Sequence, residues 1–447
     1  MGIFGTAGIR GSSEGKVNLE FCSRFGKAFA SYFISIGKKK TIVACDGRTS
    51  SEALRDSMSS SLLYEGMDII DIGKVPSPLL AFASFKYNAP GVMITASHNP
   101  PMDNGIKIFS SGFEVGLDTE KKIEDLFINS YSRKYRWEKC GSRQVIDIEN
   151  YYLDNLLAFL NKMFEKPDLD GMDILVDSGN GVGSSVITKA LNLLGANVNI
   201  VNSHVSGLFP GRPSEPSFKN LEGSLKYAER TCPDIIIAQD GDADRVNVIS
   251  SEFELIPEDT LLAFFADLYS QPGDRVVLSI DTSLAIDEFL KGKGVEVIRV
   301  PLGYLHDGIS NYDPSFAGEP WKHIHLPFGP WIDGIASSVL LSIFLKNSSF
   351  KDLFSSIPKY YQEKRNILLE EDADVDKIIK LLKNILSQRD DADEVICISG
   401  IRVNFNDNSW LLVRPSGTEP KLRVIVEGAS LSRFNELMKI VVNILEE

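Results

Sequence analysis

One pattern recurs three times along the 447 residues of the chain: an apolar strand that ends in Asp, a polar turn, an amphipathic helix, a Gly and a second apolar strand. Apolar strands that alternate with helices are typical of parallel sheets covered on both faces. The pattern predicts three similar α/β domains with mixed, largely parallel sheets. The first strands end at Asp46, Asp177 and Asp281, and the glycines are Gly66, Gly195 and Gly294.

The C-terminal part carries a different pattern. Two helical stretches, 374–386 and 432–447, enclose strand-like segments at 395–405, 410–415 and 421–428. Helices beside consecutive strands indicate an antiparallel sheet in a small α+β domain. Length alone, at about 150 residues per domain, favours three domains, but the repeats and the C-terminal part predict four. Their expected bounds are 1–149, 150–253, 254–364 and 365–447.

Net charge limits the partners that the chain can bind. The 47 Lys and Arg residues and the 61 Asp and Glu residues give a net charge of −14. This balance argues against nucleic acid or an anionic membrane surface as the main partner. An anionic small molecule would need a pocket that is locally basic.

The cysteines and the hydropathy pattern indicate a compartment. The five cysteines are scattered and show no Cys-x-x-Cys spacing, which predicts reduced, buried thiols. The N-terminal residues lack a basic stretch followed by an apolar one, and no run of 18 apolar residues occurs. We therefore expect a soluble, cytoplasmic protein. The cysteines are Cys22, Cys45, Cys140, Cys232 and Cys397.

A serine loop follows the apolar segment 91–94. Ser97 lies there between small and turn-forming residues, with His98 beside it and Lys107 ten positions on. A serine in this setting can act as a nucleophile or carry a phosphate, although it lacks the glycines of a Gly-x-Ser-x-Gly elbow. An ordinary Ser/Asn/Pro turn explains the same residues, so the loop alone leaves both interpretations open.

A second loop carries three carboxylates, Asp240, Asp242 and Asp244, followed by Arg245. Carboxylates at alternate positions can converge through oxygen atoms on one hard cation such as Mg²⁺. An EF-hand would need Gly where Arg245 stands, so that interpretation fails. A solvated acidic turn is the alternative, but three crowded like charges are costly unless a cation neutralises them. The loop therefore predicts a magnesium site.

Two further loops could bind a sugar phosphate. In the Gly/Pro-rich segment 318–323, Glu319 and His323 could recognise sugar hydroxyls and Trp321 could cover a sugar face, although a bland surface loop is an equal alternative. Segment 414–423 offers the Arg414 fork, hydroxyl groups and exposed backbone N–H groups to a phosphate. It lacks the residue order of a Walker A loop, and a solvated hairpin turn is its alternative.

Four motifs together resemble the α-D-phosphohexomutase family. In chain order they are Phe4-Gly5-Thr6-Ala7-Gly8-Ile9-Arg10-Gly11, the Thr-Ala-Ser-His-Asn-Pro serine loop, the Asp-Gly-Asp-Ala-Asp-Arg metal loop and the Arg-Pro-Ser-Gly-Thr-Glu-Pro phosphate loop. The resemblance covers essentially the full length. It implies a four-domain enzyme, arranged around a central cleft, that moves a phosphoryl group between O6 and O1 of a hexose through a sugar 1,6-bisphosphate.

The resemblance also implies residue roles. Ser97 would become the phosphoserine, and one of its phosphate oxygens would bind Mg²⁺ together with Asp240, Asp242 and Asp244. Lys107 and Arg245 would assist proton transfer and neutralise charge, and Arg10 and His98 would complete that pocket. The substrate would be bound by Glu319, Trp321, His323, Arg414, Ser416, Gly417, Thr418 and Arg423.

The sugar loop departs from the family pattern. The family commonly has Gly-Glu-x-Ser-Gly-His, whereas this chain has Trp321 and Lys322 in place of the Ser and the second Gly. The opening motif and the phosphate loop look most like the phosphoglucosamine mutase branch, so conversion of glucosamine 6-phosphate to glucosamine 1-phosphate is the expected reaction. Phosphomannomutase/phosphoglucomutase activity is the alternative. A phosphosugar-binding protein without turnover is a third interpretation, and the intact Ser97 argues against it.

Overall fold

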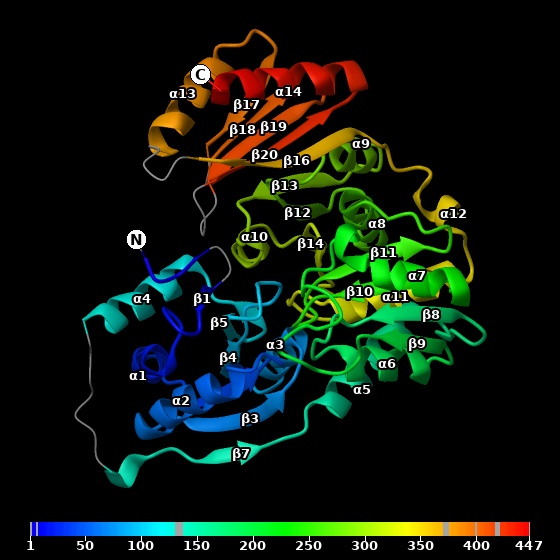
Figure 1. The fold of residues 1–447 in the computed structure, drawn as a ribbon. Helices are drawn as coiled ribbons and strands as arrows, with labels where there is room; N and C mark the ends of the chain where they lie inside the picture. The colour runs from blue at the N-terminus through cyan, green and yellow to red at the C-terminus, as the bar shows by residue number, and fades with distance from the viewer. Residues whose placement is uncertain are drawn as a thin grey trace. The chain divides into compact units, whose positions relative to one another are not determined.

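In the part of the chain that it describes, the computed structural model contains four sheets, distributed over two compact units (Figure 1). The first unit comprises Met1–Glu258 and Trp321–Leu353, and the second comprises Asp259–Pro320 and Phe354–Glu447. The residues that the structure describes are 2–5, 8–129, 137–369, 375–397, 400–415 and 421–446.

The first sheet carries the serine loop and has the strand order β1-β5-β4-β2-β3-β7, with β6 paired to β5. Strand β2 runs parallel to β3 and β4, while β5 runs antiparallel to β1 and β4. Helices α1, α2 and α4 share an apolar core with one face, and α3 contacts β2, β4 and β5 outside that core. The bounds are β1 Ile9–Ser12, β2 Lys40–Cys45, β3 Asp68–Lys74, β4 Pro90–Ile94, β5 Asp103–Ser110, β6 Phe113–Glu114, β7 Arg143–Val145, α1 Leu19–Ser35, α2 Ser51–Tyr64, α3 Ser77–Lys86 and α4 Leu117–Ile128.

The second sheet, also in the first unit, carries the metal loop and has the order β11-β10-β8-β9. Strand β10 lies parallel to β8 and antiparallel to β11, and its five apolar or amide side chains are all buried. Helix α11 contacts β10 and β11, and the Asp333 carboxylate caps its first turn by accepting from the backbone N–H groups of Ile335 and Ala336. The bounds are β8 Asp173–Asp177, β9 Asn197–Val201, β10 Ile235–Gln239, β11 Val246–Ser250, α5 Glu149–Met163, α6 Ser184–Leu193, α7 Glu222–Thr231 and α11 Gly334–Lys346. Strand β15, Lys322–Ile324, also belongs to the first unit but is not part of this sheet.

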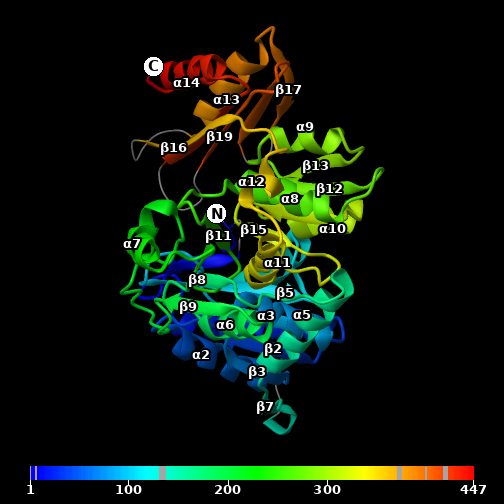
Figure 2. The ribbon, with the colours of Figure 1, turned by 90° about the vertical axis from the view of Figure 1, so that its right-hand side faces the viewer.

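The second unit combines a parallel sheet with an antiparallel one. Strands β13, β12 and β14 are parallel neighbours in that order, and β16-β20-β19-β18-β17 form the antiparallel sheet. Helices α13 and α14 cover one face of that sheet and share its apolar core (Figure 2). The bounds are β12 Arg275–Ser279, β13 Glu296–Val300, β14 Phe316–Glu319, β16 Tyr361–Leu368, β17 Ala392–Ile396, β18 Ile401–Phe405, β19 Trp410–Pro415, β20 Lys421–Gly428, α8 Glu258–Tyr269, α9 Ala285–Lys291, α10 Leu305–Tyr312, α13 Val375–Ser387 and α14 Leu431–Glu446. The short helix α12, Phe350–Phe354, lies where the chain passes from the first unit to the second.

The predicted fold class is confirmed: mixed and parallel sheets precede a C-terminal antiparallel sheet. The domain bounds and the central cleft stay predictions. The expectation of five buried thiols is wrong, because Cys140, Cys232 and Cys397 are exposed while Cys22 and Cys45 are buried. The three exposed residues lie outside the strands and helices that form the cores.

Within the described part of the chain, no helix has the length and apolar character needed to cross a membrane.

Candidate active site

The serine loop begins where β4 ends. Ser97 is fully buried and adopts a left-handed backbone conformation, with φ of 53°. Its N–H donates to Thr95 Oγ1 at 2.9 Å, and its Oγ donates to Asp240 Oδ2 at 2.6 Å. Because a non-glycine residue in this conformation is strained, the surrounding contacts must hold it there. The sequence-predicted phosphate carrier and one predicted metal ligand are therefore direct neighbours.

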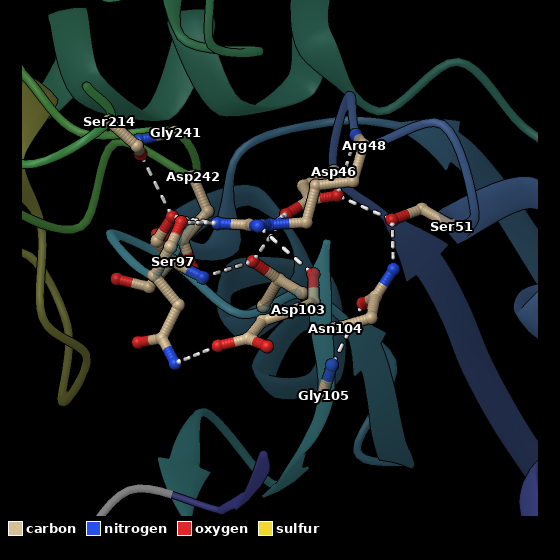
Figure 3. Close-up of polar contacts among 12 residues, drawn as sticks. Asp46, Arg48, Ser51, Ser97, Asp103, Asn104, Gly105, Ser214, Gly241 and Asp242 are labelled. Atoms are coloured by element: carbon tan, nitrogen blue, oxygen red, sulfur yellow. Dashed lines mark hydrogen bonds and ion pairs between the residues drawn. The ribbon is translucent and has the colours of Figure 1, made fainter. Parts of the chain in front are cut away.

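Arg48 provides much of that support (Figure 3). It is 1 % exposed, and its Nε donates to Asp46 Oδ2 at 3.1 Å. Its terminal nitrogens donate to four backbone carbonyl oxygens of the serine loop, those of Ser97, Asn99, Pro100 and Asp103. Asp46 accepts further hydrogen bonds from the hydroxyls of Ser51 and Thr95. The sequence pattern predicts Asp46 only as the end of a strand; the Asp-x-Arg spacing of Asp46 and Arg48 is the signal that could have marked this ion pair.

The metal loop follows β10 and brings three carboxylates together. Asp240, Asp242 and Asp244 are buried, and one oxygen of each lies within 4.8 Å of the others. Ala243 between them has φ of 55°, a second strained position beside the chemistry. Among the described residues, Asp242 Oδ1 and Asp244 Oδ1 have no hydrogen-bond partner. Buried carboxylate oxygens without partners are the donors that a hard divalent cation takes, so these residues fit a metal site.

Two side chains of the first sheet's domain reach this cluster. Lys107 Nζ on β5 lies 2.7 Å from Asp242 Oδ2 and 2.7 Å from Asp244 Oδ2. Ser77, the first residue of α3, donates its Oγ to Asp242 Oδ2 at 2.6 Å. Lys107 therefore neutralises part of the crowded charge that the sequence assigned to a metal alone. Ser77 was missed, because nothing in the sequence around it marks it.

Burial and charge shift the pKa values of this cluster in opposite directions. Burial, reinforced by Asp242 and Asp244, raises the pKa of Asp240 well above its usual range. Burial also acts on Asp244, but the charges of Lys107, Lys322 and Arg245 outweigh it and lower the pKa of that carboxyl. Burial disfavours the Lys107 ammonium, yet the two carboxylates outweigh it and raise the pKa of Lys107. Lys107 consequently keeps its proton in this arrangement.

Arg245 joins the metal loop to the sugar loop. Its Nε lies 4.0 Å from Asp240 Oδ2, and its guanidinium carbon lies 5.7 Å from the centroid of the Trp321 ring. Trp321 has φ of 69°, so each of the three loops in this unit holds a non-glycine residue in the left-handed region. The predicted cover for a sugar face thus packs against the predicted charge-neutralising arginine.

Arg10 and His98 lie near the serine as expected. Arg10 Nη1 donates to Asn99 Oδ1 at 3.0 Å, and His98 Nδ1 lies 3.4 Å from Ser97 Oγ. Burial, followed by the charges of Arg245 and Arg10, lowers the pKa of His98. Its imidazole is therefore neutral at physiological pH.

In the sequence, Lys322 stands out only because it departs from the family pattern. It lies on β15, is 4 % exposed, and its charge contributes to lowering the pKa values of Asp244 and His98. The next residue, His323, is fully buried, and its Nδ1 lies 3.0 Å from Ser337 Oγ. Burial lowers the pKa of His323 to about 3. Its contact with a sugar stays a prediction.

The second unit holds three further residues that are predicted to bind the substrate, Glu319, Arg414 and Arg423. Glu319 is buried, and its Oε2 accepts from the backbone N–H of Gly303 at 3.2 Å. Arg414 on β19 stands directly opposite Arg423 on β20. Like charges at opposed positions repel each other, and the buried Arg414 Nε has no partner among the described residues. An anion between the two arginines would resolve both features. The predicted contacts of Ser416, Gly417 and Thr418 lie outside the described residues.

Comparison with known proteins identifies the family. The four domain descriptions of phosphoglucomutase/phosphomannomutase match in order: alpha/beta/alpha domains I, II and III and the C-terminal domain. They cover residues 1–134, 150–252, 257–361 and 365–444. The chain belongs to the phosphoglucomutase/phosphomannomutase family. As a member of this family, and like its phosphopentomutase and phosphoglucosamine mutase relatives, it is a mutase, which is a kind of isomerase.

Relatives of this phosphoglucomutase/phosphomannomutase family member carry different substrate names. A phosphopentomutase of Thermococcus kodakarensis is 39 % identical over 98 % of this chain and 96 % of its own length. A "Probable phosphoglucosamine mutase" of Methanobrevibacter smithii is 34 % identical over 100 % of this chain and 98 % of its own. The crystal structure of a phosphoglucomutase/phosphomannomutase family protein from Burkholderia thailandensis superposes with a TM-score of 0.87, covers 99 % of this chain and 97 % of its own, and is 24 % identical. That structure supports the fold alone.

Proposed function

We propose that the chain is a phosphosugar mutase in which Ser97 carries the phosphoryl group between two positions of the sugar. The observation that carries this proposal is the 2.6 Å hydrogen bond from Ser97 Oγ to Asp240 Oδ2. The transferable group would therefore sit beside three carboxylates that can hold a divalent cation. Mg²⁺ held by Asp240, Asp242 and Asp244 would stabilise the charge of the phosphoryl group during transfer.

The reaction would take place in two transfers. In the first, the bond between phosphorus and Ser97 Oγ breaks and a bond from phosphorus to a sugar hydroxyl oxygen forms. The sugar hydroxyl gives up its proton and Ser97 Oγ takes one up, so that Ser97 is left as a hydroxyl. A sugar bisphosphate results, with the 1,6-bisphosphate expected for a hexose. In the second, the other phosphate of that intermediate is transferred to Ser97: its bond to the sugar oxygen breaks, a bond to Ser97 Oγ forms, the Ser97 hydroxyl gives up its proton and the sugar oxygen takes one up. The net change is an isomerisation, and the phosphoenzyme is restored.

Lys107 and Arg245 fit charge neutralisation, and Lys107 is disfavoured as a proton acceptor. The raised pKa of Lys107 keeps its ammonium protonated beside the two aspartates, so it cannot accept a proton there. Arg245 brings a second fixed positive charge to within 4.0 Å of Asp240. Both would oppose the negative charge that accumulates on the transferring group.

The substrate's non-reacting phosphate would bind to Arg414 and Arg423. Their opposed positions on β19 and β20 and the unpartnered Arg414 Nε support this role. Binding energy used on a phosphate that does not react can orient the hydroxyl that does.

Two sugars are candidates for this site. Glucosamine phosphate is expected from the opening motif and the phosphate loop, and from the name of the Methanobrevibacter smithii relative. A pentose phosphate is the second candidate, and two observations favour it. The Thermococcus kodakarensis relative is a phosphopentomutase, and Trp321 and Lys322 put larger side chains where the family commonly has Ser and Gly.

A series of kcat/KM measurements tests both the reaction through Ser97 and the identity of the preferred sugar. Purified protein with Mg²⁺ and a sugar bisphosphate activator is assayed with glucosamine 6-phosphate, glucose 1-phosphate, mannose 1-phosphate and ribose 1-phosphate. We expect turnover of at least one of them and a loss of about 1000-fold or more in Ser97→Ala. Ser57→Ala, which removes an exposed hydroxyl bonded to the Leu19 carbonyl, is the control. Undiminished turnover in Ser97→Ala would contradict the proposal.

A further inference from the structure

The carbonyl oxygen of Ser97 accepts hydrogen bonds from two sides (Figure 3). On one side Arg48 Nη2 donates at 2.7 Å, and on the other Ser214 Oγ donates at 2.9 Å. Ser214 Oγ also accepts from the backbone N–H of Gly241 at 3.0 Å. Since Gly241 lies between Asp240 and Asp242, one hydroxyl group joins the backbone of the serine loop to the backbone of the metal loop.

Ser214 lies near the end of a stretch without helix or strand, residues 202–217, and we call residues 202–214 of it the bridging segment. The side chain of Arg212 attaches the end of this segment to two strands of the second sheet, β8 and β10. Its Nε donates to Asp177 Oδ2 at 2.9 Å, and its Nη2 donates to the Gln239 carbonyl oxygen at 2.6 Å. Arg212 is 6 % exposed and Ser214 is 3 % exposed. The position of Ser214 is therefore tied to the strand that carries the metal loop.

The rest of the bridging segment packs closely on the turn that holds Arg48. A Cβ at Gly207 would lie 2.3 Å from the Thr49 nitrogen, and a Cβ at Gly47 would lie 2.5 Å from Val205 Cγ1. The Arg48 guanidinium carbon lies 5.1 Å from the centroid of the Phe209 ring. This fit leaves the segment little freedom against the turn.

Gly241 shows how closely the two loops approach. A Cβ at this position would lie 2.8 Å from Ser214 Oγ and 3.0 Å from the Ser97 carbonyl oxygen. Both distances are shorter than ordinary van der Waals contact, so any side chain would push the two loops apart. Ser214, Gly241 and the carbonyl group of Ser97 are thus packed closely together, next to the residue that carries the reacting hydroxyl.

We propose that Ser214 is a positioning residue for phosphoryl transfer. It holds the strained backbone of Ser97 against the metal loop, so that Ser97 Oγ keeps its distance from Asp240 without Ser214 touching substrate or metal. Removing its hydroxyl would deprive the Ser97 carbonyl of one donor and the buried Gly241 N–H of its acceptor. A small displacement of a reacting group can cost about 100-fold in rate. This inference rests on the proposed function of Ser97.

The test compares Ser214→Ala with a matched control, Ser84→Ala. Ser84 is also a buried hydroxyl that donates to a backbone carbonyl, that of Ala89 at 2.7 Å, and accepts from a backbone N–H, that of Gly112 at 3.4 Å. Both variants lose the same kind of contact, but only one loses the link between the two loops. The measurements are kcat, KM and the melting temperature of each variant, with Ser97→Ala assayed in parallel.

We expect Ser214→Ala to lower kcat by about tenfold or more while KM changes by less than about twofold, and Ser84→Ala to leave kcat within about twofold at a comparable loss of melting temperature. Ser214→Thr, which keeps the hydroxyl, should recover most of the lost kcat. If Ser214→Ala does not fold, Gly241→Ala must give the same fall in kcat, because its methyl group displaces the Ser214 hydroxyl.

Equal kcat values in Ser214→Ala and Ser84→Ala would overturn the inference. With Ser97→Ala inactive, that result leaves the proposed function standing. An active Ser97→Ala would instead overturn the proposed function itself, whatever Ser214→Ala does.

Discussion

Ser97 Oγ donates a hydrogen bond to Asp240 Oδ2 at 2.6 Å, although the two residues are 143 positions apart in the chain. Ser97 follows β4 of the first sheet, and Asp240 follows β10 of the second. Both loops leave the carboxyl ends of strands that have a parallel neighbour, which is where α/β folds place ligands. Two sheets therefore share one candidate centre within a single compact unit.

The first prediction concerns the metal. Chelation of divalent cations should abolish turnover, and added Mg²⁺ should restore it. Asp242→Asn should lower kcat by about 100-fold or more, because it removes a charge that the cation needs. Steady-state assays after chelation and readdition measure this, with Asp118→Asn, which changes an exposed carboxylate on α4, as the control. Full turnover after exhaustive chelation would show that no metal is needed.

A second prediction concerns the support of the serine loop by Arg48. Lys in its place cannot reach four carbonyl oxygens and Asp46 at once, because it lacks the planar fork. Arg48→Lys should therefore lower the free energy of unfolding by about 3 kcal/mol, since it leaves buried acceptors unmatched. Urea unfolding measures the change. Arg275→Lys, which alters an exposed ion pair with Glu296, should cost less than about 0.5 kcal/mol. A similarly small loss in the free energy of unfolding for Arg48→Lys would mean that the planar guanidinium group of Arg48 is not needed to support the serine loop.

A third prediction concerns pH and the buried His323. Burial lowers its pKa to about 3, whereas in the unfolded chain it is about 6.5. Between these values the unfolded state binds more protons, so the stability that His323 contributes falls as pH falls below 6.5. Between pH 7 and 5.5 the loss should be about 1 kcal/mol. His323→Gln should lack this part of the pH dependence. The free energy of unfolding of both proteins is measured by urea unfolding at each pH, and the difference between their slopes against pH isolates the contribution of His323. Identical slopes would contradict the buried, neutral imidazole.

Much of the site could be predicted because its chemistry is carried by short local motifs. Three carboxylates at alternate positions after a buried strand, and a serine among small turn residues, are visible without any structure. The repeated pattern of an apolar strand ending in Asp, a turn and a helix also predicted the α/β sheets, because it marks where each strand ends and where the following helix begins. In the structure, Asp46 and Asp177 have the same role: each carboxylate forms an ion pair with a buried arginine, Asp46 with Arg48 and Asp177 with Arg212.

The supporting residues could not be predicted, because their partners are far away in sequence. Ser214 lies 117 positions from Ser97, and Ser77 lies 165 positions from Asp242. A single serine in a loop carries no pattern that reports such a contact. Lys322 shows the same limit: the sequence marks it as unusual, and only the fold shows that it is buried with its charge acting on Asp244.

The central claim is that Ser97 carries the phosphoryl group, and intact-mass measurement tests it most directly. After incubation with a sugar 1,6-bisphosphate and Mg²⁺, the protein should gain about 80 Da, and the gain should map to the peptide that contains Ser97. A sugar monophosphate should remove it, and Ser97→Ala should never show it. Turnover without any gain in mass, or the same gain in Ser97→Ala, would contradict the account.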